Sequence, residues 1–294
     1  MFERLVVIQI EKIPRVFFKS TNFILTVIVF IGTAILSATS VSADSYAKRT
    51  ECLDCLITGF YKDTKHILTS PFHWSKQNLI TFAVLSVGTS GLMLADEDLQ
   101  DLVQDHRNST TNRISNWTNR NTRRVKNLTI GGFYLSGVIF NNKKAKETAF
   151  LCLESVILAE GITTAIKHVV GRTRPCGNKG AFNFDPLEYP PPPASLSFPS
   201  GHTTTAFALS SVIAEQYRST PLAIALYGWA TVVSLARVNS NVHFMSDVFW
   251  GGVIGIYVGK AIVKFSKPGA SKNYRIHFID KPDYTGIGVG ISII

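Results

Sequence analysis

Six stretches of this chain are uncharged or nearly uncharged over the length of a helix. They are residues 78–95, 127–142, 148–166, 203–217, 221–236 and 248–265. Strict alternation of apolar and polar residues, which is typical of a half-buried strand, is nearly absent from them. Because such stretches have to cover one another or meet lipid, we expect an all-α fold, a helical bundle of about six core helices.

Two polar segments interrupt the predicted bundle. Residues 96–126 run from acidic to basic, and residues 175–199 include Pro190–Pro193, which exclude a helix interior there. The tail at 267–294 contains two strand-like runs around a turn and predicts a short β-hairpin. The predicted organisation is a signal peptide or anchor at 1–43, a polar segment at 44–77, a helical domain at 78–266 and the tail at 267–294.

The first 43 residues have the order of a secretory signal peptide. Four Lys or Arg residues precede an apolar run at 23–36 and small residues that end at Ala43. This order predicts cleavage after Ala43, since the run is shorter than the ~20 residues that a membrane span needs. An uncleaved anchor helix is the alternative, and both interpretations imply export.

The membrane disposition follows less directly. The mean hydropathy of +0.17 lies between that of soluble domains and that of lipid-facing bundles. If an exported chain began outside and all six stretches crossed the bilayer, Lys167 would return to the cytoplasmic side. We therefore expect a domain in the periplasm or cell envelope that is soluble or membrane-associated, with some stretches only touching the membrane.

Cysteine and charge give weaker constraints. Cys52 and Cys55 favour a local disulfide or free thiols over a metal site, because no second Cys or His pair has zinc-like spacing. The formal charge of +10 favours anionic partners, which include nucleic acid, anionic lipid and phosphorylated substrates.

Basic residues gather at the end of one apolar stretch. Lys167, Arg172 and Arg174 follow residues 148–166, and Pro175 ends the element. A single cation at a helix C-terminus is explained by the helix dipole, but three of them favour a clamp for an anion.

A second polar segment starts the next predicted helix. In Pro199-Ser200-Gly201-His202, Ser200 is a candidate N-cap and Gly201 allows close approach of a ligand to the backbone. His202 is placed to give a proton to a leaving oxygen.

A third segment contains Arg237, His243 and Asp247. Residues four apart share a helix face, so Asp247 can accept the imidazole N–H of His243 and leave the other ring nitrogen free as a nucleophile. Such a pair alone is more often a structural hydrogen bond, whereas the three segments together favour a catalytic site.

Together these segments resemble the type 2 phosphatidic acid phosphatase and vanadium haloperoxidase superfamily. Its signature has Lys, six residues and Arg-Pro; then Pro-Ser-Gly-His; then Ser-Arg, five residues, His, three residues and Asp. The three segments match that order and spacing, and the resemblance covers roughly residues 75–266. One position departs, because Ala236 stands where the family usually has Ser.

The resemblance implies a metal-independent phosphatase. His243 would attack phosphorus to form a phosphohistidine, Asp247 would hold His243, and His202 would protonate the leaving oxygen and later activate water. The phosphoryl oxygens would be bound by Lys167, Arg174, Ser200, Gly201 and Arg237. No metal or other cofactor is expected, and vanadate is expected to bind as an inhibitor.

The substrate class stays open at this point. Phosphorylated lipids such as phosphatidate, an isoprenyl diphosphate or lipid A are favoured by the apolar chain, and soluble phosphomonoesters, as for a periplasmic acid phosphatase, are the alternative. A vanadium-dependent haloperoxidase is a further one. The basic residues between 106 and 126 would suit an anionic membrane surface or a solvated loop, whereas nucleic acid is disfavoured because no nucleic-acid motif is present.

Overall fold

The computed structural model describes residues 53–192, 194–266, 274–279 and 288–293. The predicted signal or anchor, its cleavage after Ala43, and Cys52 lie outside these residues. Export and the state of Cys52 and Cys55 therefore stay predictions.

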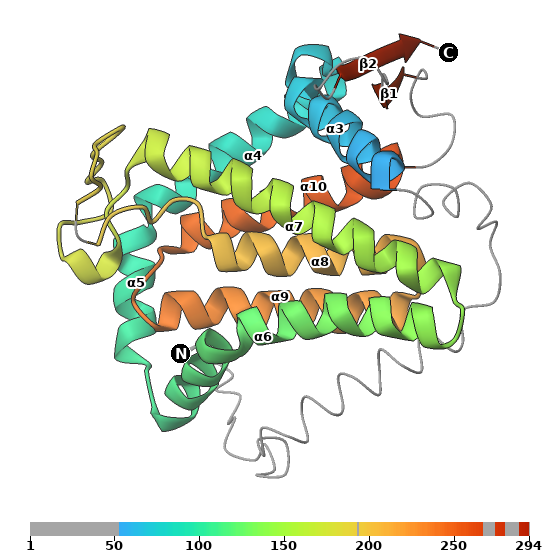
Figure 1. Ribbon diagram of the computed structural model, residues 1–294. Helices are drawn as coiled ribbons and strands as arrows, with labels where there is room; N and C mark the ends of the chain where they lie inside the picture. The colour runs from blue at the N-terminus through green and yellow to red at the C-terminus, as the bar shows by residue number, and fades with distance from the viewer. Residues whose placement is uncertain (1–52, 193, 267–273, 280–287, 294) are drawn as a thin grey trace. The chain divides into compact units, whose positions relative to one another are not determined.

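The described part of the chain is helical apart from its connections and two terminal strands (Figure 1). The helices are α3 (Leu53–Thr69), α4 (Lys76–Leu94), α5 (Asp96–Asp105), α6 (Ser109–Ile139), α7 (Lys143–Val170), α8 (Gly201–Tyr217), α9 (Thr220–Asn239) and α10 (Met245–Phe265), with 3₁₀ turns η3 (Ser70–His73) and η4 (Pro175–Gly177). Each predicted apolar stretch lies in one of these helices to within three residues. The all-α prediction is confirmed.

The two strands lie in the C-terminal tail. β1 (Tyr274–Ile279) and β2 (Gly288–Ile293) pair antiparallel, with Tyr274 opposite Ile293 and Ile279 opposite Gly288. The strand pairing of the predicted hairpin is therefore present.

The acidic-to-basic segment 96–126 does not interrupt the helices, contrary to the prediction from sequence. It forms α5 and the first half of α6. Asn108 starts α6 with a capping box, because its side-chain oxygen accepts the N–H groups of Thr110 and Thr111 while the Thr111 hydroxyl accepts the Asn108 N–H. This half of α6 buries polar side chains, so no apolar stripe marks it in the sequence: Ser115, Thr118, Asn121 and Thr122.

A row of glycines lets α10 pack closely along α8. Gly251, Gly255 and Gly259 are spaced at four residues and face the α8 backbone. A Cβ on Gly251 would lie 2.7 Å from the carbonyl oxygen of Ser200, and one on Gly259 would lie 2.6 Å from that of Ala208. The contact therefore requires glycine, and it holds the first turn of α8 against the first turns of α10.

The segments singled out from the sequence gather at one end of the helices. Successive helices from α6 to α10 alternate in direction, so the C-termini of α7 and α9 lie beside the N-termini of α8 and α10, at the left of Figure 1. Helix α5 lies at the same end and connects α4 to α6. Helix ends present unpaired backbone groups and accept polar side chains, which makes this end suited to a polar site.

Four described helices are long and apolar enough to cross a membrane: α4, α7, α9 and α10. Only 6% of the apolar window of α4 is buried, and apolar side chains such as Ile80, Val84 and Val87 are exposed on it. Because water disfavours so large an apolar face, the chain is associated with a membrane.

Replacing Gly255 by Ala should destabilise the helical domain. The added Cβ would lie 2.8 Å from the Phe207 Cβ and 2.9 Å from the Ala208 backbone nitrogen, and overpacking of this kind costs about 1–3 kcal/mol. Gly228 is the matched control, because it lies inside α9 with nothing within 4 Å of an added Cβ. Thermal unfolding in detergent should show a lower midpoint for Gly255→Ala and an unchanged or higher one for Gly228→Ala. Equal midpoints for the two variants would contradict close packing of α8 and α10.

Candidate active site

The three sequence motifs meet at this end of the helices. Lys167 lies in the last turn of α7, Ser200, Gly201 and His202 lie at the start of α8, Arg237 lies in the last turn of α9, and His243 precedes α10. His202 interacts electrostatically with Lys167, Arg174 and Arg237. His243 interacts with Lys167 and Arg237 in the same way. The structure therefore brings the predicted site residues together.

Lys167, Arg174 and Arg237 form no ion pair with a carboxylate among the residues that the structure describes. Lys167 Nζ donates to two backbone carbonyl oxygens of the loop before α8, at 2.5 and 3.1 Å. Arg237 Nη1 donates to Oδ1 of Asn119 at 2.7 Å. The Nε atoms of Arg174 and Arg237 are buried without a hydrogen-bond partner in this part of the chain. Three neighbouring cations with spare donors favour a bound anion.

The N-terminus of α8 adds backbone donors to the cations. Ser200 occupies the N-cap position, as predicted, but its side chain makes no capping bond and accepts the hydroxyl of Thr203 at 3.1 Å. A Cβ on Gly201 would lie 3.8 Å from Cγ2 of Thr163 and 4.0 Å from Cε of Lys167, which is ordinary van der Waals contact. The fold itself therefore tolerates a side chain at Gly201, and glycine keeps the helix end open to an approaching group.

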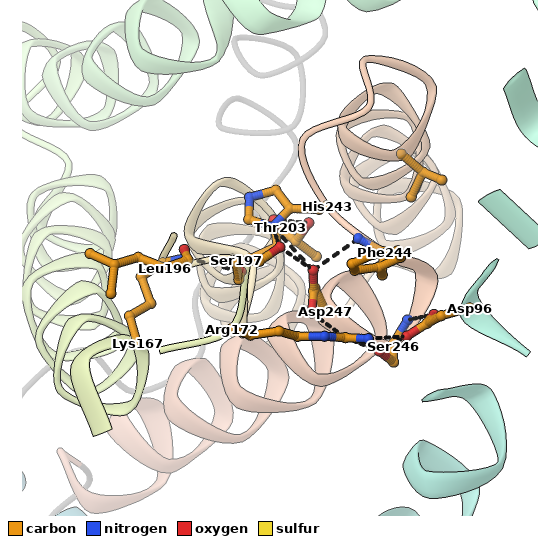
Figure 2. Close-up of polar contacts among 12 residues, drawn as sticks. Asp96, Lys167, Arg172, Leu196, Ser197, Thr203, His243, Phe244, Ser246 and Asp247 are labelled. Atoms are coloured by element: carbon orange, nitrogen blue, oxygen red, sulfur yellow. Dashed lines mark hydrogen bonds and ion pairs between the residues drawn. The ribbon is translucent and has the colours of Figure 1, made fainter. Parts of the chain in front are cut away.

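His243 and Asp247 meet, although not across a helix face as predicted. His243 lies in the turn before α10, and Asp247 lies in the first turn of that helix. Asp247 Oδ2 is 3.5 Å from His243 Nδ1, and it accepts the Phe244 N–H at 2.8 Å and the Ser197 hydroxyl at 2.5 Å (Figure 2). The carboxylate therefore caps α10 and orients the imidazole through Nδ1, which leaves Nε2 as the free ring nitrogen.

Arg172 does not join the anion-binding cations, contrary to the interpretation from sequence. Its side chain is fully buried and donates to Asp247 Oδ1 at 2.7 Å, to Asp96 Oδ2 at 2.8 Å and to the Ser246 hydroxyl at 2.7 Å (Figure 2). Its guanidinium also lies over the Phe244 ring, 4.4 Å from the centroid. The charge of Arg172 is neutralised inside the protein, and an added anion has no access to it.

Sequence reasoning missed Asp96, Ser197 and Ser246, which surround Arg172 and Asp247. Ser197 belongs to the proline-rich loop, and Ser246 has no feature that distinguishes it in the sequence. Asp96 did carry a signal. It directly follows the apolar stretch 78–95, and an acidic side chain beside a helix C-terminus is disfavoured by the helix dipole unless a partner compensates it.

Burial lowers the pKa of both site histidines. Burial is the main cause that lowers the pKa of His243 to about 3, with the hydrogen bond to Asp247 opposing it. Burial also lowers the pKa of His202 to about 4, and Arg237 is the next cause. Both rings are therefore neutral at pH 7 in the empty site. A dianion bound among the cations would favour the protonated form of His202.

Comparison with known families gives one match inside the chain. Residues 148–268 match the PAP2 superfamily. This segment contains all three motifs, whereas α4, α5 and α6 lie before it.

Individual relatives match over stretches of similar length. The chain is 39% identical over 105 residues to a lipid A 1-phosphatase of Porphyromonas gingivalis, covering 35% of this chain and 20% of that protein. It is 32% identical over 105 residues to a decaprenylphosphoryl-5-phosphoribose phosphatase of Mycobacterium tuberculosis, covering 36% of this chain and 54% of that protein. The chain thus spans between a fifth and about half of these relatives. The crystal structure of LpxE from Aquifex aeolicus is similar with a TM-score of 0.45 and 22% identity, over 57% of this chain and 94% of that chain.

The lowered pKa values predict the protonation of the imidazoles. Because His202 and His243 have pKa values of about 4 and about 3, both rings should be neutral from pH 5 to pH 8 in the free protein. Ring-nitrogen NMR of protein labelled with ¹⁵N in histidine should show this. Added orthovanadate should shift the His202 signal towards the imidazolium form, since the bound anion favours the charged ring. Titration of either ring near pH 6.5 in the free protein would contradict the burial described above.

Proposed function

We propose that this chain, which belongs to the PAP2 superfamily through residues 148–268, is a metal-independent phosphatase that removes phosphate from phosphorylated lipids. One observation carries the proposal. Lys167, Arg174 and Arg237 converge without a carboxylate partner in the described residues, beside the neutral imidazole of His243. Such a site attracts a phosphoryl group and presents a nucleophile to it.

Substrate binding uses the groups that the protein leaves free. Lys167, Arg174 and Arg237 bind the non-bridging phosphoryl oxygens, and Ser200 and the N–H of Gly201 add donors from the start of α8. Phosphoryl transfer depends on positioning and on neutralising the oxygens, and here cationic side chains take the place that a metal ion has in other phosphatases.

The first chemical step transfers the phosphoryl group to His243. The lone pair of Nε2 attacks phosphorus, and the bond between phosphorus and the leaving oxygen breaks. The leaving oxygen takes its proton from His202, which the bound phosphate holds in the protonated form. Asp247 accepts Nδ1–H and stabilises the positive charge that develops on the ring.

The second step returns the site to its starting state. Water attacks the phosphorus of the phosphohistidine and gives a proton to His202, which is neutral after the first step. The bond between phosphorus and Nε2 breaks, the electron pair returns to His243, and inorganic phosphate leaves. The two steps together consume one water and release one alcohol and one phosphate.

A lipid substrate is favoured by two independent observations. Both relatives named above act on phosphorylated lipids by name. The exposed apolar faces of α4 and the other candidate membrane helices keep the site end close to the lipid in which such substrates reside. A soluble phosphomonoester and a vanadium-dependent haloperoxidase reaction are the competing outcomes of the assay below.

Phosphate release should depend on His243 and not on a metal. The full chain in detergent would be assayed with phosphatidate, an isoprenyl diphosphate, lipid A and an aryl phosphate, each with and without EDTA. Preferred release from a lipid is expected, with loss of at least ~10³-fold in His243→Ala, the size of effect seen on loss of a nucleophile. His73→Ala is the matched control, because His73 is exposed in η3, just before the start of α4, whereas the site lies beyond the end of that helix.

Other outcomes of this assay are equally informative. Faster turnover of the aryl phosphate would replace the lipid substrate with a soluble one. Halide oxidation in the presence of vanadate, without phosphate release, would replace the phosphatase with a haloperoxidase. Release that survives His243→Ala would overturn the proposed nucleophile.

We also propose that the chain is exported and that the site faces the periplasm or cell envelope. The order of charged, apolar and small residues before Ala43 supports export. If the chain begins outside, crossings by α4 and α7 together with α6, which is not one of the four candidate membrane helices, would place Lys167 in the cytoplasm. The proposal therefore requires that some of these helices lie against the membrane without crossing it.

Cys176 offers a native probe of this location. It is exposed and free beside Arg174, whereas Cys152 is buried. A membrane-impermeant maleimide applied to spheroplasts of the expression host should label the wild-type chain more than Cys176→Ser, as judged by mass spectrometry of the peptide that contains residue 176. Labelling of that peptide only after lysis would place the site in the cytoplasm.

A further inference from the structure

We propose that Asp96 is a positioning residue for the His243–Asp247 pair and acts on it through Arg172. The inference rests on the proposed phosphatase function for its kinetic test, and it has a second test that needs no activity. Asp96 lies before the segment that matches the PAP2 superfamily, so the family match does not include it.

The Asp96 carboxylate is fully buried and fully used. Oδ2 accepts Arg172 Nη2 at 2.8 Å and the Ser246 hydroxyl at 2.5 Å, and Oδ1 accepts the Ser246 N–H at 3.0 Å (Figure 2). Ser246 is the second residue of α10 and directly precedes Asp247. Asp96 therefore holds the start of the helix from which Asp247 reaches His243.

Arg172 connects the two carboxylates. Its Nη2 faces Asp96 and its Nη1 faces Asp247 Oδ1, at 2.8 and 2.7 Å, and all three side chains are fully buried. With Asp96 in place, the guanidinium charge is shared between two anions. Without the negative charge of Asp96, Arg172 would be paired with Asp247 alone. Asp247 would then be a weaker acceptor for the Nδ1–H of His243.

Helix α5 also holds the turn that carries His243 from its other side. Gln100 Nε2 donates to Asn241 Oδ1 at 2.7 Å, and Gln104 Nε2 donates to the Val238 carbonyl oxygen at 3.3 Å. Glu97 Oε1 accepts the Ala181 N–H at 2.7 Å in the loop whose Ala181 carbonyl oxygen receives Arg172 Nε. One face of α5 thus contacts the chain both before and after His243. Asp96 is part of that face, so its role is not confined to α5.

The substitution Asp96→Asn tests the proposal with almost unchanged shape. The amide oxygen can still accept from Ser246, but the negative charge opposite Arg172 is lost. We expect kcat to fall by about 10- to 100-fold, which is the range found in metal sites when the hydrogen-bond partner of a metal-ligating residue is removed. The inhibition constant of inorganic phosphate should be unchanged, because phosphate is held through its oxygens and Lys167, Arg174 and Arg237 are untouched. Asp98→Asn, at an exposed position of the same helix, should leave both quantities unchanged.

A double-mutant cycle separates positioning from a general structural effect. If Asp96 acts through Asp247, Asp96→Asn should have no further effect on kcat in an Asp247→Asn background. Additive losses, or an unchanged kcat in the single variant, would overturn the proposal. If Asp96→Asn does not fold, Arg172→Lys keeps a cation between the two carboxylates but cannot donate to both of them from one planar group. It should lower kcat in the same direction, and an unchanged kcat there would equally overturn the proposal.

The second test distinguishes failure of this proposal from failure of the proposed function. In the free protein, the ¹⁵N NMR signal of His243 Nδ1 should report its interaction with Asp247, which lies 3.5 Å away. Asp96→Asn should move that signal and Asp98→Asn should not. A signal that does not move would reject the role of Asp96. A moved signal in a chain that releases no phosphate would keep the role of Asp96 and reject the phosphatase.

Discussion

A guanidinium enclosed by two carboxylates sets the geometry on which the rest of the site depends. Arg172, Asp96 and Asp247 are fully buried, and Arg172 is separated from Asp96 by 76 residues and from Asp247 by 75. A buried charge is tolerated only where a partner and hydrogen bonds satisfy it, and loss of one partner leaves the other uncompensated. The start of α5, the end of α7 and the start of α10 therefore have to meet, and they bring the site residues with them.

The apolar helices and this polar network determine different features of the fold. Apolar length determines that helices form and lie side by side, and the glycines of α10 determine how closely α8 approaches. Neither property specifies the turn that carries His243. The hydrogen bonds of Asp247 to Phe244, Ser197 and Arg172 fix that turn, because they place it within the reach of one carboxylate.

The sequence predicted the helical class and a set of candidate site residues that the fold brings together, but it did not predict the residues that hold them in place. Periodicity finds a helix by its apolar residues and so predicts α4 and α7 to α10. It does not predict α5 and the first half of α6, because their buried side chains include the polar Asp96, Gln100 and Ser115. The motif spacing identified His243 and Asp247 as a pair but implied a shared helix face. Arg172 and Arg174 belong to the same motif, and the sequence does not distinguish them. The structure does, because Arg172 is fully buried and paired with Asp96 and Asp247, whereas Arg174 has no ion pair in the described residues.

The free cations have a consequence for the protein when no substrate is present. Lys167, Arg174 and Arg237 repel one another in a site where no carboxylate of the described residues forms an ion pair with them. Any phosphate-like ion that binds the folded chain therefore stabilises it, by a free energy that grows with the logarithm of the ion's concentration over its dissociation constant. For the phosphatase proposed above, inorganic phosphate is the product and resembles the bound phosphoryl group in charge and shape. Its accumulation would therefore raise the folded population and lower the turnover.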